Sequence, residues 1–245
     1  MKYSPYSYSK INTFKNCPYR FKLQYVDKIR TKFNVSPALE KGKFIHYGLE
    51  HYLKGTLREK INDYNFQLAS SDEIKEYRKQ LKQVLLSKDI QWYKSFSDIK
   101  TEFGFGIIFK DNDIDVIGYS NKADIRGYID LLAYDEFSNE VYIIDYKTGK
   151  FREEQDKLQV AIYYLVAVKK YPEVENFNLI FNFVEHSKTV EIKYTRDDFQ
   201  KVLEFVRSSL SKVENADEFP KITTFCNWCP YYNEGHCNGI SEENY

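Results

Sequence analysis

Two carboxylates and one ammonium fall inside strongly apolar segments of this chain. The segment DIRGYIDLLAY contains Asp130, and the segment VYIIDYK contains Asp145 and Lys147. Side chains alternate across an extended strand, so Asp145 and Lys147 project from one face while Tyr146 points away. A hairpin through residues 135–140 would bring Asp130 alongside them. Charges in such surroundings are costly unless they are paired or coordinate a metal.

Carboxylate oxygens are ligands that magnesium and manganese prefer, so Asp130 and Asp145 predict a site for a hard divalent cation. The ammonium of Lys147 could hold an attacking water or stabilise charge that develops on a phosphoryl group. The alternative is an Asp–Lys ion pair at a strand end, which is the more common outcome for an isolated D-x-K sequence. The rest of the chain must decide between the two.

Two predicted helices carry further polar residues. The first covers about residues 153–170, with a core-facing stripe that contains Leu158 and Ile162. Gln159 and Tyr163 lie four residues apart and share a neighbouring face of this helix. The second begins at a Ser-Pro pair, covers about residues 37–53, and carries His46 beside its apolar stripe. A lone histidine in such a place is more often a core residue than a ligand.

Together these residues resemble the signature of the PD-(D/E)XK nuclease superfamily, and specifically of its RecB-like branch. In that branch the second strand typically reads Asp-Tyr-Lys-Thr, as residues 145–148 do here, and a Gln-x-x-x-Tyr pair lies on the next helix. The segment GKFIHYGLE, which contains His46, resembles the branch's Gly-x-x-x-His helix. Ile129 stands in place of the proline of the superfamily's name, a residue that is often replaced.

The resemblance implies roles for these side chains. Gln159 and Tyr163 would contact the DNA strand near the scissile phosphate. Glu102 matches a position where the branch often carries an acid near the metals, although an exposed Glu at a strand start is commonplace. The implied catalytic residues are Asp130, Asp145, Lys147, Gln159 and Tyr163. The implied ligands of Mg²⁺ or Mn²⁺ are His46, Glu102, Asp130 and Asp145.

All four cysteines of the chain form one candidate ligand set. Cys226 and Cys229 make a C-x2-C pair, Cys237 follows, and Cys17 lies far upstream. Four thiolates suit either a tetrahedral zinc or an iron–sulfur cluster, and His236 could replace one cysteine in a zinc site. The arrangement resembles the iron–sulfur nucleases, namely the AddB helicase–nuclease subunit and the CRISPR-adaptation exonucleases. That resemblance implies a 4Fe–4S cluster held by the four cysteines.

Composition sets the outer bounds. The 245 residues suit one large domain with a real core, and the formal net charge is zero, so any DNA binding must use local patches. The best candidate patch is the basic stretch 10–32. The N-terminus has no apolar signal segment and no apolar run could span a bilayer, which predicts a cytoplasmic protein without membrane contact.

The expected fold is α/β and restriction-endonuclease-like: a central mixed sheet flanked by helices, with a helical N-terminal portion and a cluster-bound C-terminal segment. Ser71 and the acids after it predict the start of a long helix through residue 94. Thr195 with Asp198 resembles a capping box for a helix over residues 196–214. The predicted strands are 101–109, 113–119, 124–134, 141–147, 178–186 and 188–195.

The expected organisation is one nuclease domain over residues 1–245, in which segments 1–35 and 216–245 flank a core of 36–215. The expected function is metal-dependent exonucleolytic hydrolysis of single-stranded DNA ends, in CRISPR adaptation or in phage or bacterial recombination and repair, with protein partners in such a complex. Two alternatives are a catalytically inactive DNA-binding or assembly subunit that keeps the fold, and a zinc-stapled structural protein.

Overall fold

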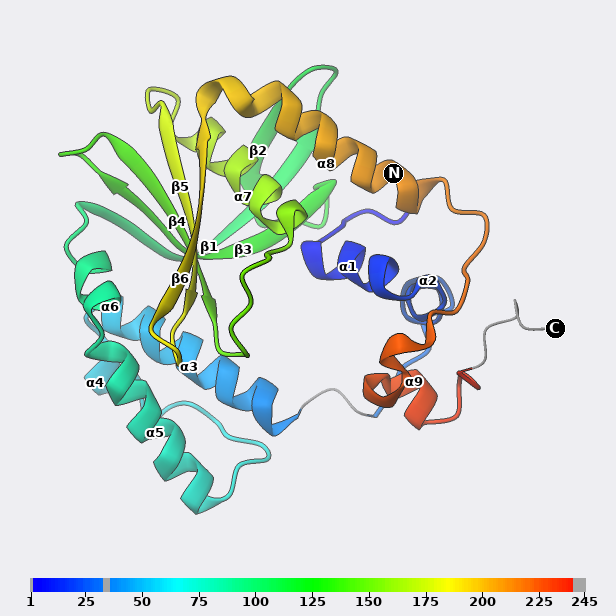
Figure 1. Cartoon of the computed structure of the whole chain (residues 1–245), viewed down its shortest axis with the longest axis horizontal. Helices are drawn as coiled ribbons and strands as arrows, with labels where there is room; N and C mark the ends of the chain where they lie inside the picture. The colour runs from blue at the N-terminus through cyan, green and yellow to red at the C-terminus, as the bar shows by residue number, and fades with distance from the viewer. Residues whose placement is uncertain (1, 33–35, 240–245) are drawn as a thin grey trace.

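A six-stranded mixed sheet forms the centre of the computed structural model, which describes residues 2–32 and 36–239 (Figure 1). The strand order is β2-β1-β3-β4-β5-β6; β4 and β5 run parallel, and the other neighbours run antiparallel. The predicted α/β class, with a central mixed sheet flanked by helices, is confirmed. The strands are β1 (Asp98–Phe109), β2 (Ile114–Gly118), β3 (Ile125–Asp135), β4 (Glu140–Lys147), β5 (Asn176–Phe183) and β6 (Lys188–Thr195).

Helices cover both faces of the sheet and create two apolar cores. On one face lie α3 (Pro37–Leu53), the short α4 (Leu57–Lys60), α5 (Ser71–Leu85) and α6 (Lys88–Tyr93). On the other face α7 (Lys157–Lys170) is packed between the sheet and α8 (Phe199–Glu214), which follows the turn η2 (Arg196–Asp198). Among the described residues no helix is long and apolar enough to cross a membrane.

Helix α7 is buried on every side over residues 158–168. The sequence pattern predicted a core-facing stripe containing Leu158 and Ile162, with Gln159 on a neighbouring face. That one-sided description is wrong, because the sheet covers α7 from one side while α8 covers it from the other. Gln159 and Tyr163 are therefore buried as well, at 7% and 9% exposure.

The long helix predicted over residues 71–94 is two helices. Ser70, rather than the predicted Ser71, caps α5: its hydroxyl accepts from the Glu73 N–H while the Glu73 carboxylate accepts from the Ser70 N–H. The chain turns after Leu85, and Ser87 caps α6 through the N–H of Ile90. In contrast, the predicted box of Thr195 and Asp198 is present before α8.

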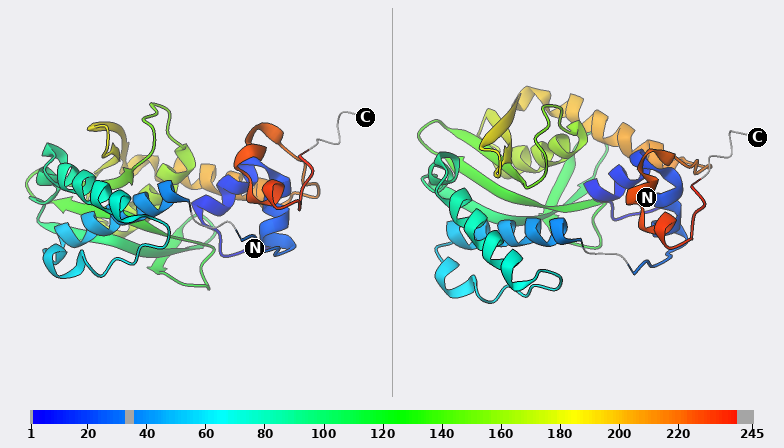
Figure 2. Two further views of the ribbon diagram at one scale, coloured as in Figure 1. Left: turned by 90° about the horizontal axis from the view of Figure 1, so that it is seen from below. Right: turned by 60° about the horizontal axis from the view of Figure 1, so that its bottom comes forward.

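The two ends of the described chain lie side by side at one edge of the molecule (Figures 1 and 2). The N-terminal part contains α1 (Tyr8–Asn16), α2 (Pro18–Phe21) and the π turn η1 (Lys22–Val26); the C-terminal part contains η3 (Thr223–Trp228) and α9 (Pro230–Asn233). The stacked rings of Phe21 and Phe219, 6.3 Å apart, join the parts, and the Tyr231 hydroxyl donates to the carbonyl of Ile29 at 3.0 Å.

Candidate active site

Strands β3 and β4 separate at the point where their carboxylates begin. Their pairing runs from Asp135 opposite Glu140 to Leu131 opposite Ile144 and stops there. At the next position the Asp130 side chain accepts the N–H of Tyr146 through Oδ2 at 2.7 Å. Asp130 therefore takes the place of a ladder bond, and its carboxylate is fixed in the opening between the two strands.

Glu102 faces Asp130 from the neighbouring strand. The residues on either side of Glu102 keep the β1–β3 register, which sets Glu102 opposite Asp130. Its φ of 47° lies in the left-handed region, where a non-glycine residue costs about 1–3 kcal/mol. Such strain persists only where the surroundings impose it, and here it accompanies two acids held close together.

His46 approaches the same point from α3. Its Nε2 lies 3.0 Å from the carbonyl oxygen of Tyr146, and its Nδ1 lies 3.5 Å from Asp130 Oδ1. A carbonyl only accepts, so Nε2 carries a proton and Nδ1 is the nitrogen directed at the acids. Histidines that bind metals are commonly oriented by such a second hydrogen bond.

A glycine one turn earlier allows this approach of α3. A Cβ on Gly42 would lie 2.8 Å from Thr148 Oγ1, which is shorter than side chains tolerate. The Gly-x-x-x-His spacing therefore places a residue without a side chain against Thr148, directly after β4, and His46 follows one turn later. The backbone of Tyr146 then holds both Asp130 and His46.

These side chains fit a hard divalent cation. One ligand atom from each of His46, Glu102 and Asp130 lies within 4.8 Å of the others, and all three residues are partly buried. Asp145 lies outside this group in the described part of the chain. One of its buried oxygens, Oδ2, accepts no hydrogen bond and lies 2.5 Å from the Lys147 ammonium; a carboxylate oxygen is a further ligand suited to such a cation.

Mutual repulsion of the acids changes their protonation. Burial, followed by the negative charge of Asp130, raises the pKa of Glu102 to about 7. Burial also raises the pKa of Asp145, and Asp130 adds to that shift. Burial lowers the pKa of His46, but hydrogen bonding to Asp130 and its charge outweigh burial and raise that pKa to about 9. The site is thus short of positive charge.

Asp145, Lys147, Gln159 and Tyr163 form one connected network. Lys147 Nζ lies 2.5 Å from Asp145 Oδ2, as an ion pair without the angles of a hydrogen bond, and donates to Gln159 Oε1 at 3.2 Å. The Gln159 amide donates to Asp145 Oδ1 at 2.7 Å and to the Tyr163 hydroxyl at 3.0 Å. Asp145 and Lys147 thus lie on the same face of β4, as strand alternation predicts.

Sequence reasoning missed two contributors to this site. The backbone of Tyr146 has no signal in the sequence, because any residue type offers the same N–H and C=O. The second is Tyr8 of α1, which lines both grooves that meet at Gln159. Burial, then the charges of Asp156 and Asp145, raises the pKa of the Tyr8 hydroxyl. Its position in an aromatic N-terminus, MKYSPYSY, was the available signal.

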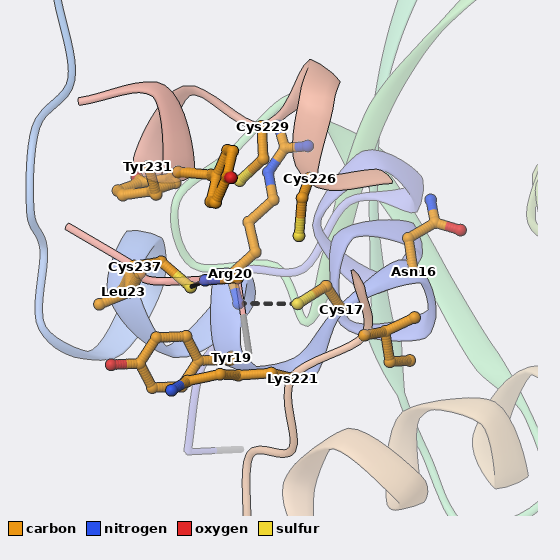
Figure 3. A pocket seen from close by; sticks show the side chains of 13 residues that line it. Asn16, Cys17, Tyr19, Arg20, Leu23, Lys221, Cys226, Cys229, Tyr231 and Cys237 are labelled. Carbon is orange, nitrogen blue, oxygen red and sulfur yellow. Dashed lines mark hydrogen bonds between the residues drawn. The ribbon is translucent and has the colours of Figure 1, made fainter. Parts of the chain in front are cut away.

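The four cysteines line one cavity between the two ends of the chain (Figure 3). Two backbone amides approach the sulfurs: Arg20 N–H donates to Cys17 Sγ at 3.4 Å, and Gly239 N–H donates to Cys237 Sγ at 3.5 Å. Burial, then the neighbouring thiols, raises the pKa of Cys226. A cavity with four thiols fits a thiophilic metal centre.

Two other predictions concerned residues near this cavity. His236, the substitute ligand considered for zinc, is not among the cavity's lining residues, and its Nε2 lies 3.8 Å from Glu234. In the basic stretch 10–32, Lys15 pairs with Asp156 and Lys22 pairs with Asp27. Part of that positive charge is therefore offset within the protein.

Comparison with known proteins gives a family and a fold. The chain is similar to the crystal structure of a candidate exonuclease from Eubacterium rectale, with a TM-score of 0.51 and 13% identity over 92% of this chain and 86% of that one. A second crystal structure, of SSO0001, has a TM-score of only 0.40 and 14% identity over 94% and 85%. No curated protein matches the sequence.

A family model described as the PD-(D/E)XK nuclease superfamily matches residues 5–233, which span both the sheet and the helices that carry the acids, Lys147 and His46. The chain belongs to the PD-(D/E)XK nuclease superfamily.

Proposed function

We propose that this nuclease belongs to the RecB-like branch and degrades single-stranded DNA from its ends with Mg²⁺ or Mn²⁺. One observation carries the proposal: His46, Glu102 and Asp130 gather at the separation of β3 and β4, directly beside the network of Asp145 and Lys147. The fold-level likeness to a candidate exonuclease supports the exonucleolytic mode.

In this proposal His46, Glu102, Asp130 and Asp145 hold the cation, which when bound activates water and offsets charge on the phosphoryl group. Lys147 keeps an ammonium at the reacting phosphate, because Asp145 holds it by charge and Gln159 holds it by a hydrogen bond. Gln159 and Tyr163 orient the scissile strand. Asp145, Gln159 and Tyr163 are buried, so the groups that hold the lysine are preorganised and add to its effect on the transition state.

We also propose that the four cysteines bind a 4Fe–4S cluster, with zinc as the competing occupant. The cluster would unite segments 1–35 and 216–245 with the core 36–215 as one domain; residues 1, 33–35 and 240–245 lie outside the described chain. The biological setting proposed is CRISPR adaptation or phage or bacterial recombination and repair, in which partner proteins would deliver single-stranded ends.

The test is digestion of end-labelled single-stranded and double-stranded DNA in Mg²⁺ or Mn²⁺, with EDTA as the control. We expect progressive shortening of linear single strands and no cleavage of a circular single strand, because the latter has no end. Cutting of the circle would replace the exonuclease assignment by an endonuclease. Binding without cleavage in either metal would support the catalytically inactive subunit.

A further inference from the structure

Two exposed tyrosines, Tyr119 and Tyr128, stack on each other beside the candidate active site. The ring centroids of Tyr119 and Tyr128 lie 4.7 Å apart at 26°, and the two residues remain 45% and 47% exposed. The guanidinium of Arg126 lies 4.7 Å from the centre of the Tyr119 ring and donates to Asn121. Much of the surface of this pair therefore stays in contact with solvent, and another planar group can stack on it.

A glycine makes room for the pair and fixes its distance from the acids. A Cβ on Gly104 would lie 3.0 Å from Tyr128 Cε1 and 3.2 Å from Tyr119 Cβ. Gly104 is paired with Tyr128 across β1 and β3, two residues from Glu102 and from Asp130. At the rise of an extended strand, two residues correspond to about 7 Å along the sheet.

The pocket beside the tyrosines has the composition of a nucleic-acid site. It has a volume of about 530 Å³, within the range of small-ligand sites, and seven of its lining residues are aromatic. Its two ionisable cations are Lys10 and Arg126, and no carboxylate is among its lining residues, although the chain has 36 acids. Burial, then the charge of Arg126, lowers the pKa of Lys10, whereas the charge of Glu214 raises it. The Lys10 ammonium donates to the carbonyls of Tyr3 and Pro5, and it lies close to the Arg126 cation.

The pocket continues into the catalytic network. Gln159 and Tyr163 are among its lining residues, and Gln159 is hydrogen-bonded to both Asp145 and Lys147. Aromatic rings with adjacent cations and no acids are what single-stranded nucleic acid requires, because every base has a face that can stack and every phosphate is negative.

We propose that Tyr119, Tyr128 and Arg126 form a base-stacking platform that holds the substrate strand next to the scissile phosphate. The platform binds a nucleobase of single-stranded DNA on the tyrosine rings, while Arg126 and Lys10 contact the flanking phosphates. This assignment rests on the proposed function and adds to it the way in which the strand is gripped. Double-stranded DNA, whose bases are covered by their neighbours, cannot use the platform.

The experiment measures binding of a short labelled oligonucleotide in EDTA, which separates binding from cleavage. One abasic residue is stepped along the strand. The wild-type protein should lose about 5-fold or more in affinity when the abasic residue occupies the platform position. Tyr128→Ala should bind the intact strand about 5-fold or more weakly than the wild type does, and its affinity should not depend on the abasic position. Tyr128→Phe should keep the wild-type affinity and position dependence, because the ring is kept.

Matched controls separate stacking from general damage. Phe137 is 93% exposed in the β3–β4 turn, so Phe137→Ala removes an aromatic ring away from the platform and should bind as the wild type does. Thermal unfolding checks that each variant is folded. If Tyr128→Ala does not fold, Tyr119→Leu replaces it as the test of stacking. Arg126→Gln should weaken binding at every abasic position alike and flatten the salt dependence.

Wild-type affinity in Tyr128→Ala and Tyr119→Leu, or no loss with any abasic position, would overturn the platform and leave the nuclease proposal standing. Position-dependent binding in a protein that cleaves no DNA with Mg²⁺ or Mn²⁺ would support the platform and overturn the nuclease proposal. Tighter binding of an RNA strand of the same sequence would overturn the choice of DNA.

Discussion

Asp145 and Lys147 form an ion pair whose members have different surroundings. The Asp145 side chain is 9% exposed and the Lys147 side chain is 30% exposed, so the carboxylate depends on the lysine while the ammonium can reach a substrate. A buried carboxylate without its partner is strongly disfavoured. The pair is thus both a structural contact and a means of holding one positive charge at the site.

Replacing Lys147 by Ala should reduce single-turnover cleavage of labelled single-stranded DNA by about 10²–10³-fold or more, because a preorganised charge at the transition state is lost. DNA binding in EDTA should remain close to that of the wild type. Lys193→Ala is the matched control, since Lys193 pairs with Glu191 two residues away on exposed β6. Cleavage by Lys147→Ala at the wild-type rate would contradict the catalytic assignment.

Divalent-cation binding should strengthen between about pH 6 and pH 9, because Glu102 (pKa about 7) and His46 (pKa about 9) must lose protons to act as ligands. Without metal, the folding stability of the protein changes with pH in the opposite direction. Both pKa values are raised above their ordinary 4.5 and 6.5, so the stability they contribute is lost as the pH rises from 4.5 to about 7 and from 6.5 to about 9.

The measurement is the rise in melting temperature caused by Mn²⁺. It should be larger at about pH 8.5 than at about pH 6, since more of the ligand set is then deprotonated. Glu102→Gln removes one titrating group, so its Mn²⁺-induced rise should be smaller and should change mainly through the His46 range. Equal rises at both pH values in the wild type would refute this linkage.

At the scale of elements, two devices build the site. The separation of β3 and β4 after Leu131 opens the sheet, and the close contact of Gly42 with Thr148 brings α3 to that opening. Helix α5 in turn packs on α3, with Leu81 against Gly48. The helices on this face therefore support His46, and their stability is part of the site's geometry.

The capping box of α5 gives a prediction that distinguishes two adjacent serines. Ser70→Ala should lower the free energy of unfolding by about 1 kcal/mol, because the Glu73 N–H loses its partner at the helix start. Ser71→Ala removes an exposed side chain inside the first turn and should change the stability by less than about 0.5 kcal/mol. Urea denaturation of both variants measures this, and the reverse order would restore the cap predicted from the sequence.

At the scale of the whole molecule, the cysteine cavity joins segments that are about as far apart in sequence as the chain allows. Cys17 stands between α1 and α2, while the other three cysteines follow the last long helix. Closing so long a loop restricts the unfolded chain, although the gain grows only slowly with loop length. The N-terminal segment also lines the grooves beside Gln159, so a metal centre held by the four cysteines would fix part of the proposed substrate path.

Anaerobically purified protein should be brown and contain about four irons per chain, as a four-thiolate cubane requires. Cys17→Ser should lose the iron and lower the melting temperature together, because one substitution removes both a ligand and the closure. Lys147→Ala is the control and should keep its iron, since Lys147 does not line the cavity. One zinc per chain without iron would replace the cluster by a zinc site.

Local patterns in the sequence were enough for much of the fold. Ser36 caps α3 as its position before Pro37 predicts, and the alternating apolar runs correspond to the strands. These features depend on neighbours within a few residues, so composition and spacing suffice. The same holds for the common face of Asp145 and Lys147, which follows from strand alternation.

Tertiary structure decided the rest, because it depends on contacts between distant segments. The burial of α7 on both sides follows from α8 lying over it, which no pattern within α7 indicates. Asp130 is held by the amide of Tyr146, and Glu102 adopts a left-handed φ opposite it, only because three strands meet there. The sequence by itself determined which residues could bind a cation; long-range packing determined how they are brought together.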